Sequence, residues 1–199
     1  MNAGPTSERV YEALKRRILE RGWRPGDRLD PSSIGEELNS SVTPVRDALN
    51  ILSGERLVDT RTSEGFHVPS LDAPALEDLY NWNAQVLDTA IRNWRPGGTL
   101  RRPAPSGDPA EQTAILFTAI AGRSDNVEHV RCVASLNDRL HAVRLTEPEL
   151  IASTDQELDA LSAASLTDDR RALRAALATY HRTRRRHAAG TVRALYRPR

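Results

Sequence analysis

Polar side chains suited to contacting a nucleic acid are concentrated in the stretch from Asn39 to Leu52. Thr43, Arg46 and Asn50 recur there at helical spacing and carry a hydroxyl, a guanidinium and an amide. Such groups bind phosphate oxygens and the edges of bases. The sequence has no G-x-S-x-G elbow, glycine-rich phosphate loop or H-E-x-x-H motif. The residue types therefore favour DNA recognition over catalysis, and we expect no enzyme activity.

The same stretch predicts the helix that would present these groups. Ser41 is expected to cap it by accepting a hydrogen bond from a first-turn N–H group. Pro44 is tolerated in the first turn, where its missing donor costs nothing, and it sets the helix start just before Thr43. Three apolar residues at i, i+4 and i+7 form one stripe for burial: Val45, Leu49 and Leu52.

The elements around this helix follow the order of a winged helix-turn-helix. Asp30 and Pro31 predict the start of the preceding helix, and Asn39 is expected to end it in the left-handed conformation. A turn at 63–65 would join the two strands of a hairpin. The predicted elements are helices over 8–21, 31–39 and 43–52 and strands over 57–61 and 66–68.

The remainder of the chain predicts an all-helical bundle, so the fold class is mostly α. The breaker-rich segment 95–109 is expected to be a mobile loop. Residues 1–70 would form the DNA-binding domain and residues 71–199 a domain for dimerisation and effector binding. Its predicted helices cover 72–94, 110–122, 126–144, 147–164 and 168–195.

Composition bounds the class of protein. The chain has 199 residues and a single cysteine, Cys132, and it has no apolar run of the roughly 20 residues that span a membrane. These features predict a cytoplasmic protein without membrane association. Residues 1–70 carry ten basic and eleven acidic side chains, a net charge of −1, whereas 175–199 carry seven arginines and no acid. The basic surface expected of a DNA-binding protein thus lies outside the predicted DNA-binding domain.

Specific motifs resemble the GntR family of bacterial repressors, and the all-helical remainder resembles its FadR-like branch. The resemblance implies a winged helix-turn-helix joined to a helical effector domain, here with five helices where that branch generally has six. The residues that carry it form three groups: Leu14, Ile18, Leu19, Pro25, Gly26, Asp27, Arg28 and Leu29; Ser41, Thr43, Pro44, Val45, Arg46, Ala48 and Leu49; and Leu57, Val58 and Gly65.

The resemblance implies DNA contacts from Ser41, Thr43 and Arg46, with Gly65 letting the wing approach the minor groove. Ser33 and Val42 stand where relatives usually carry basic residues, which predicts weaker binding or an altered operator. The full predicted DNA-binding set is Ser33, Ser41, Val42, Thr43, Pro44, Arg46, Asn50, Arg61 and Gly65. Further phosphate contacts are expected from Arg9, Lys15, Arg16 and Arg17.

The effector domain departs from the resemblance at the metal site of many relatives, which use one Asp and three His. Those positions fall on Ala114, on Thr118, near Glu157 or Leu158, and near Thr179 or Tyr180. The position of an arginine that often binds the effector carboxylate falls on Asn83. We therefore expect no metal cofactor and a metal-independent pocket, lined by Asn83, Thr118, Arg139 and Tyr180.

Together these features predict a homodimeric repressor that binds a short inverted repeat in double-stranded DNA and responds to an unidentified small-molecule effector. An alternative is a protein-interaction module whose winged helix has lost strong DNA binding. The run His181–His187 is interpreted as a solvated helix end, with phosphate contacts or a partner surface as the alternative. Cys132 is interpreted as a core thiol, and Trp82 and Trp94 as packing or interface residues.

Overall fold

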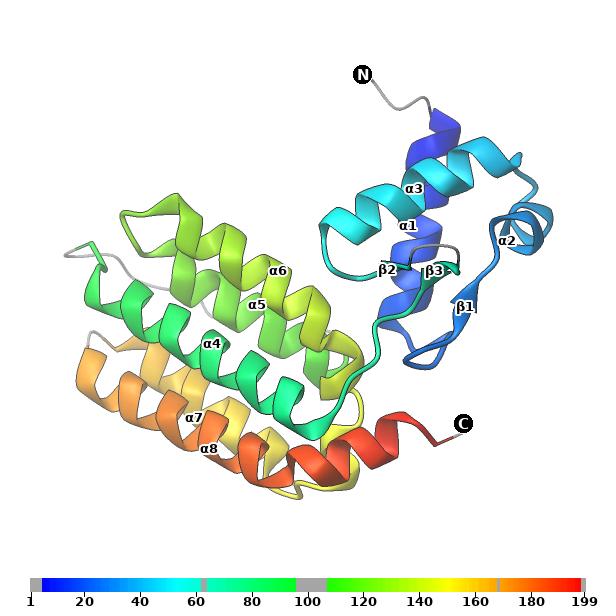
Figure 1. Cartoon of the computed structure of the whole chain (residues 1–199). Helices are drawn as coiled ribbons and strands as arrows, with labels where there is room; N and C mark the ends of the chain where they lie inside the picture. The colour runs from blue at the N-terminus through cyan, green and yellow to red at the C-terminus, as the bar shows by residue number, and fades with distance from the viewer. Residues whose placement is uncertain (1–4, 62–63, 96–106, 168, 198–199) are drawn as a thin grey trace. The chain divides into compact units, whose positions relative to one another are not determined.

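The computed structural model describes residues 5–61, 64–95, 107–167 and 169–197 (Figure 1). The chain divides into two compact units, Met1–Leu71 and Asp72–Arg199. The predicted fold class is confirmed: a winged helix-turn-helix with a small antiparallel sheet is followed by an all-helical unit. No helix in the described parts of the chain is long and apolar enough to cross a membrane.

The N-terminal unit contains three helices and a three-stranded sheet. The sheet has the order β1-β3-β2, and Phe66 pairs with Leu29 on one side and Thr60 on the other. The elements are α1 (Pro5–Leu19), β1 (Arg28–Leu29), α2 (Pro31–Glu37), α3 (Val42–Gly54), β2 (Asp59–Arg61) and β3 (Gly65–His67).

Several predicted boundaries in this unit are wrong by two or three residues, and one strand was not predicted. The first helix ends at Leu19, because Arg21 takes a left-handed φ of 62°. The hairpin ladder begins at Asp59, because Leu57 and Val58 are buried in the core instead. The two-residue strand β1 was not expected, since so short a segment shows no alternation. Its pairing with β3 is a contact between distant parts of the chain.

In its described residues, the C-terminal unit is a bundle of five α-helices with a short 3-10 turn. Its elements are α4 (Ala73–Arg92), α5 (Pro109–Gly122), α6 (Val127–Arg144), η1 (Glu147–Glu149), α7 (Thr154–Leu166) and α8 (Arg170–Leu195). Asp72, Asp108, Asn126 and Asp169 each accept a hydrogen bond from a first-turn N–H group, which stabilises four of the helix starts. Most of the predicted loop at 95–109 lies outside the described residues, and Pro109 already belongs to α5.

The predicted helix over 147–164 is wrong at its start, because a 3-10 turn precedes α7. The carboxylate of Glu147 is buried and bound to side chains of α4 and α8, which holds the turn against the bundle. Within the bundle, α4 and α8 lie side by side (Figure 1). They run antiparallel, since Asn81 contacts Arg185 near one end and Asp88 contacts Arg174 further along. Phe117 of α5 is fully buried at the centre of the core.

Candidate nucleic-acid interface and bundle core

Helix α3 has one buried and one exposed face. Val45, Leu49 and Leu52 are fully buried against α1, as the apolar stripe predicts. The opposite face presents the predicted contact groups to solvent, and these residues are exposed: Val42, Thr43, Arg46, Asp47 and Asn50. At about 100° per residue they fall within roughly 140° of the helix circumference. Such a face can enter a groove while the buried stripe fixes its orientation.

The turn between α2 and α3 sets how closely the two helices approach. The Ser40 N–H group donates to the Gly35 carbonyl at 2.9 Å. Asn39 has a left-handed φ of 50°, as the sequence predicts. A Cβ atom at Gly35 would lie 2.8 Å from the Ser40 carbonyl oxygen. Gly35 is thus required for the turn. Sequence reasoning missed it because a glycine inside a short helix does not reveal what packs on it.

Two serines behave differently from expectation. Ser41 occupies the cap position of α3, but its side chain makes no cap hydrogen bond, and the helix begins at Val42 rather than Thr43. Its exposed hydroxyl is therefore not engaged in capping. The Ser33 hydroxyl donates to Asp30 at 3.0 Å, and the Ser33 N–H group donates to the same carboxylate oxygen at 2.9 Å. Ser33 thus helps to cap α2.

The wing and the first helix supply less free positive charge than their sequences imply. Gly65 has a φ of 83°, a conformation that glycine adopts without strain. Arg61 lies 3.4 Å from Glu64. Lys15 pairs with Glu55 at 3.1 Å, and Arg17 pairs with Glu37. Arg46 on α3 is exposed and has no ion pair among the described residues. The first residue of the predicted turn, at position 63, lies outside the described residues.

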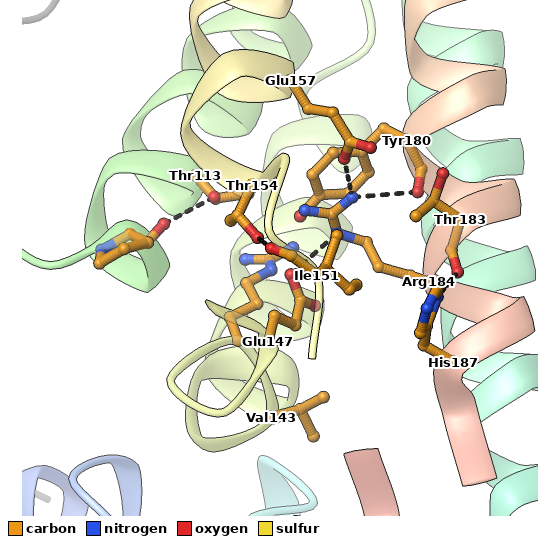
Figure 2. A network of polar contacts seen from close by, with 12 residues as sticks. Thr113, Val143, Glu147, Ile151, Thr154, Glu157, Tyr180, Thr183, Arg184 and His187 are labelled. Carbon is orange, nitrogen blue, oxygen red and sulfur yellow. Dashed lines mark hydrogen bonds and ion pairs between the residues drawn. The ribbon is translucent and has the colours of Figure 1, made fainter. Parts of the chain in front are cut away.

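The bundle core contains a buried ionic network (Figure 2). The Arg184 guanidinium is 1% exposed; it donates to Glu147 at 2.8 Å, donates to Glu157, and lies 3.3 Å from the centre of the Tyr180 ring. The Tyr80 hydroxyl donates to the other Glu147 oxygen at 2.7 Å. Burial raises the pKa of Tyr80 well above its usual value, and the Glu147 carboxylate raises it further. Arg184 and His181 are buried. The prediction that the run 181–187 is a solvated helix end is therefore wrong for these two residues.

His181 is a neutral, fully buried side chain in this core. Burial lowers its pKa to about 3. Its ring lies 5.9 Å from that of Phe117, Nδ1 lies 2.8 Å from the Leu177 carbonyl, and Nε2 lies 2.9 Å from the Asn83 side-chain amide. A neutral imidazole has one N–H group, and Nδ1 donates it to the carbonyl. The Asn83 atom that faces Nε2 is the oxygen Oδ1, while its Nδ2 has no partner among the described residues; reversing this amide would let its NH2 group donate to Nε2.

Three of the four predicted effector residues are drawn together around Phe117. Tyr180 packs edge-on against Phe117 and against His181, which contacts Asn83. Thr118 accepts from Asn137 at 3.1 Å. Arg139 lies about 140–160° around α6 from Asn137 and Arg144. It is half-buried on a different face of that helix, apart from these two residues.

Arg144 is the core residue that sequence reasoning missed. It is 2% exposed, and its Cζ atom lies 5.2 Å from the centre of the Phe117 ring. One nitrogen donates to the Asn137 side-chain oxygen at 2.9 Å, whereas Nε and Nη2 have no partner among the described residues. The signal was present: Asn137, Leu140 and Arg144 share one face at i, i+3 and i+7. A cation ending an apolar row could have been noticed.

The core residues do not fit the divalent metal of related proteins. Ala114 contributes only its backbone carbonyl, which accepts from Asn137, and Thr118 contributes a hydroxyl. Glu157 is ion-paired with Arg184. No group of three or more His, Cys, Asp or Glu side chains with metal-binding geometry occurs in the described parts of the chain. The two buried guanidinium groups lie where a bound cation would be repelled.

Cys132 and Trp94 pack into the bundle core, whereas Trp82 is exposed. Cys132 is half-buried and packs against the main apolar cluster. Trp94 is buried beneath Arg123, whose Cζ atom lies 3.7 Å from the ring centre, and its indole N–H donates to the Ile120 carbonyl. Trp82 is 49% exposed.

The N-terminal unit is a winged helix-turn-helix domain, and comparison with known proteins shows which proteins it resembles. Residues 6–68 match the model of the bacterial regulatory proteins of the gntR family. The chain is 37% identical over 137 residues to the Nta operon transcriptional regulator of Aminobacter aminovorans, an alignment that covers 61% of this chain and 65% of that protein. The chain also matches three further relatives, and these alignments cover 36% to 41% of the relatives' own length.

Solved structures share the fold of the whole chain. A transcriptional regulator GntR of Rhodococcus sp. RHA1 superposes with a TM-score of 0.70 at 23% identity and covers 92% of this chain and 97% of its own. McbR/YncC of Escherichia coli superposes with a TM-score of 0.65 at 19% identity and covers 94% of this chain and 99% of its own. Over residues 6–68 the chain is thus similar to the gntR family, and its second unit shares the all-helical fold of these solved structures.

Proposed function

We propose that this protein is a transcriptional regulator, most simply a repressor, that binds double-stranded operator DNA as a homodimer. The exposed face of α3 carries the proposal, because it presents Thr43, Arg46 and Asn50 from a helix anchored by its buried stripe. A two-fold dimer would read an inverted repeat, since each copy contributes one such helix. The named relatives are themselves transcriptional regulators.

The charge of the N-terminal unit sets the expected strength of this interaction. Arg46 is the only cation on the exposed face of α3, and Asp47 lies beside it. Val42 on α3 and Ser33 on α2 leave two further positions of the predicted DNA-binding set uncharged. Because phosphate contacts supply much of the affinity of DNA-binding proteins and set its salt dependence, we infer that the N-terminal unit binds weakly and with a shallow salt dependence.

Footprinting of the purified full chain on DNA flanking its own gene tests the proposal. We expect protection of an inverted repeat by the unaltered protein and none by Arg46→Ala. Arg131→Ala is a matched control, because Arg131 is exposed on α6 and pairs with Glu128. If no DNA is protected at low salt, the regulator is wrong and the protein-interaction module becomes the better description.

We further propose that the bundle core binds an effector carrying a carboxylate or a similar oxygen acceptor, without a metal. The unpartnered Nε and Nη2 donors of Arg144 support this, because a guanidinium binds a carboxylate through two parallel hydrogen bonds. Glu147 already accepts from Arg184 and Tyr80, which leaves its oxygens occupied. Asn83, Tyr180 and Thr118 line the same core around Phe117.

Thermal unfolding with a panel of small carboxylates (acetate, malate and benzoate), measured with and without EDTA, tests the effector site. We expect at least one to raise the Tm of the unaltered protein and to have no effect on Arg144→Gln. Arg139→Gln should respond like the unaltered protein, since Arg139 lies on another face of α6. A carboxylate that raises the Tm of the Arg144 and Arg139 variants equally binds elsewhere. A response that EDTA abolishes would mean that carboxylate binding requires a metal ion.

A further inference from the structure

A stripe of arginines follows the solvent-facing side of α8 over its second half. We call it the arginine stripe, and each of its five members is exposed: Arg182, Arg185, Arg186, Arg193 and Arg197. At about 100° per residue the four arginines on α8 fall within roughly 100° of the helix circumference. Arg197 lies just after the helix end at Leu195, fifteen residues or about 22 Å along from Arg182. The stripe is thus a continuous basic surface rather than scattered charges.

The charge of the stripe is not neutralised within the described residues. Arg182 donates to the Thr179 hydroxyl and Arg185 to the Asn81 side-chain oxygen, both of which are neutral. Arg186, Arg193 and Arg197 have no ion pair in the parts of the chain that the structure describes. The inward-facing Arg184 is instead buried between two carboxylates. Residues 175–199 contain no acid at all.

The stripe lies at the end of the bundle where the chain enters from the N-terminal unit. Because α4 and α8 run antiparallel, with Asn81 beside Arg185, the first turn of α4 lies alongside the last turns of α8. That first turn begins at Ala73, five residues after Val68 ends the core of the N-terminal unit. A cationic surface here could add to the phosphate contacts that a unit of net charge −1 lacks.

We propose that the arginine stripe binds DNA phosphates beside the operator, as a second contact surface of the same protein. The proposal rests on the proposed function, because it assumes that the N-terminal unit binds DNA. Arginine suits the role, since its planar group forms paired hydrogen bonds with phosphate. A duplex carries one phosphate per about 1.7 Å of its axis, so a stripe of about 22 Å faces about a dozen. The apolar side of α8 is buried in the bundle, which leaves no apolar face for a membrane.

The test is the salt dependence of duplex binding by the full chain, measured by fluorescence anisotropy on a random-sequence duplex and on the protected operator. The stripe variant is Arg182→Gln, Arg186→Gln and Arg193→Gln. The matched control, Arg92→Gln, Arg95→Gln and Arg131→Gln, removes the same formal charge from exposed arginines that pair with Asp88, Asp125 and Glu128.

We expect the stripe variant to lower the slope of log K against log salt by about 2 to 3, and the affinity at low salt by tenfold or more. The control should keep the slope of the unaltered protein. Arg46→Ala should lose the preference for the operator over the random-sequence duplex. It should keep the part of the slope of log K against log salt that the arginine stripe contributes.

Equal slopes for the stripe variant and the control would overturn the stripe and leave the regulator intact, with an acidic protein as the next partner to test. If the unaltered protein binds neither duplex, the proposed function fails and the stripe proposal fails with it.

Discussion

Breaking the buried ion pair between Arg184 and Glu147 is expected to destabilise the bundle strongly. Their side chains are 1% and 2% exposed, so replacing Arg184 by Met leaves the Glu147 carboxylate in the core with only the Tyr80 hydroxyl. Removing one partner of such a pair costs about 3–5 kcal/mol. For a unit of this size the loss corresponds to a fall in Tm of about 10–20 °C.

The double variant Arg184→Met, Glu147→Gln separates lost charge pairing from lost packing. The glutamine still accepts from Tyr80 and carries no charge, so we expect the double variant to recover at least about 2 kcal/mol relative to Arg184→Met. Glu157 loses its partner in both variants but is 18% exposed and reaches water. Urea unfolding followed by circular dichroism at 222 nm measures the free energies. Effects that simply add, within about 0.5 kcal/mol, would refute the uncompensated charge as the cause.

Three further predictions concern the pH dependence, the turn and the charge of the recognition surface. The His181 pKa is lowered to about 3 in the folded chain, so the unfolded chain binds the extra proton between pH 6.5 and 3 and stability falls as pH falls. From pH 7 to 5 the loss from this group is about 2 kcal/mol, and urea unfolding of His181→Phe should lack it; an unchanged pH dependence contradicts the assignment. Gly35→Ala should destabilise the N-terminal unit by about 1–3 kcal/mol, because its Cβ atom meets the Ser40 carbonyl. Gly54→Ala meets nothing within 4 Å and should be neutral or stabilising in the same unfolding assay. Val42→Arg should raise the affinity for DNA and steepen the salt slope by about 0.9 in an anisotropy titration, and a weaker complex would contradict the placement of Val42 on the DNA-facing surface.

Local periodicity was sufficient for much of the fold. The stripe of Val45, Leu49 and Leu52 identified the buried face of α3, and Asp30 with Pro31 identified the start of α2, because each signal acts over a few residues. The 3-10 turn at Glu147 was not predictable in this way. It is held by Tyr80, 67 residues earlier, and by Arg184, 37 residues later.

The two candidate sites differ in the same way: one follows from local helical spacing, and the other depends on contacts between distant parts of the chain. The exposed residues of α3 follow from helical spacing, and the contacts that the sequence assigns to them remain predictions. The bundle core depends on which side chains from α4, α6 and α8 converge on Phe117. Asn83 and Tyr180 were identified through the resemblance, whereas Arg144 was overlooked in favour of Arg139, only five residues away but on another face of α6.

Selection of duplexes from a random-sequence pool by the purified full chain tests the central claim most directly. The account predicts enrichment of an inverted repeat whose half-sites are one helical turn or a simple multiple apart, and loss of that enrichment with Arg46→Ala. A pool that remains unselected at low salt, or a motif that Arg46→Ala selects equally well, would contradict DNA recognition by α3.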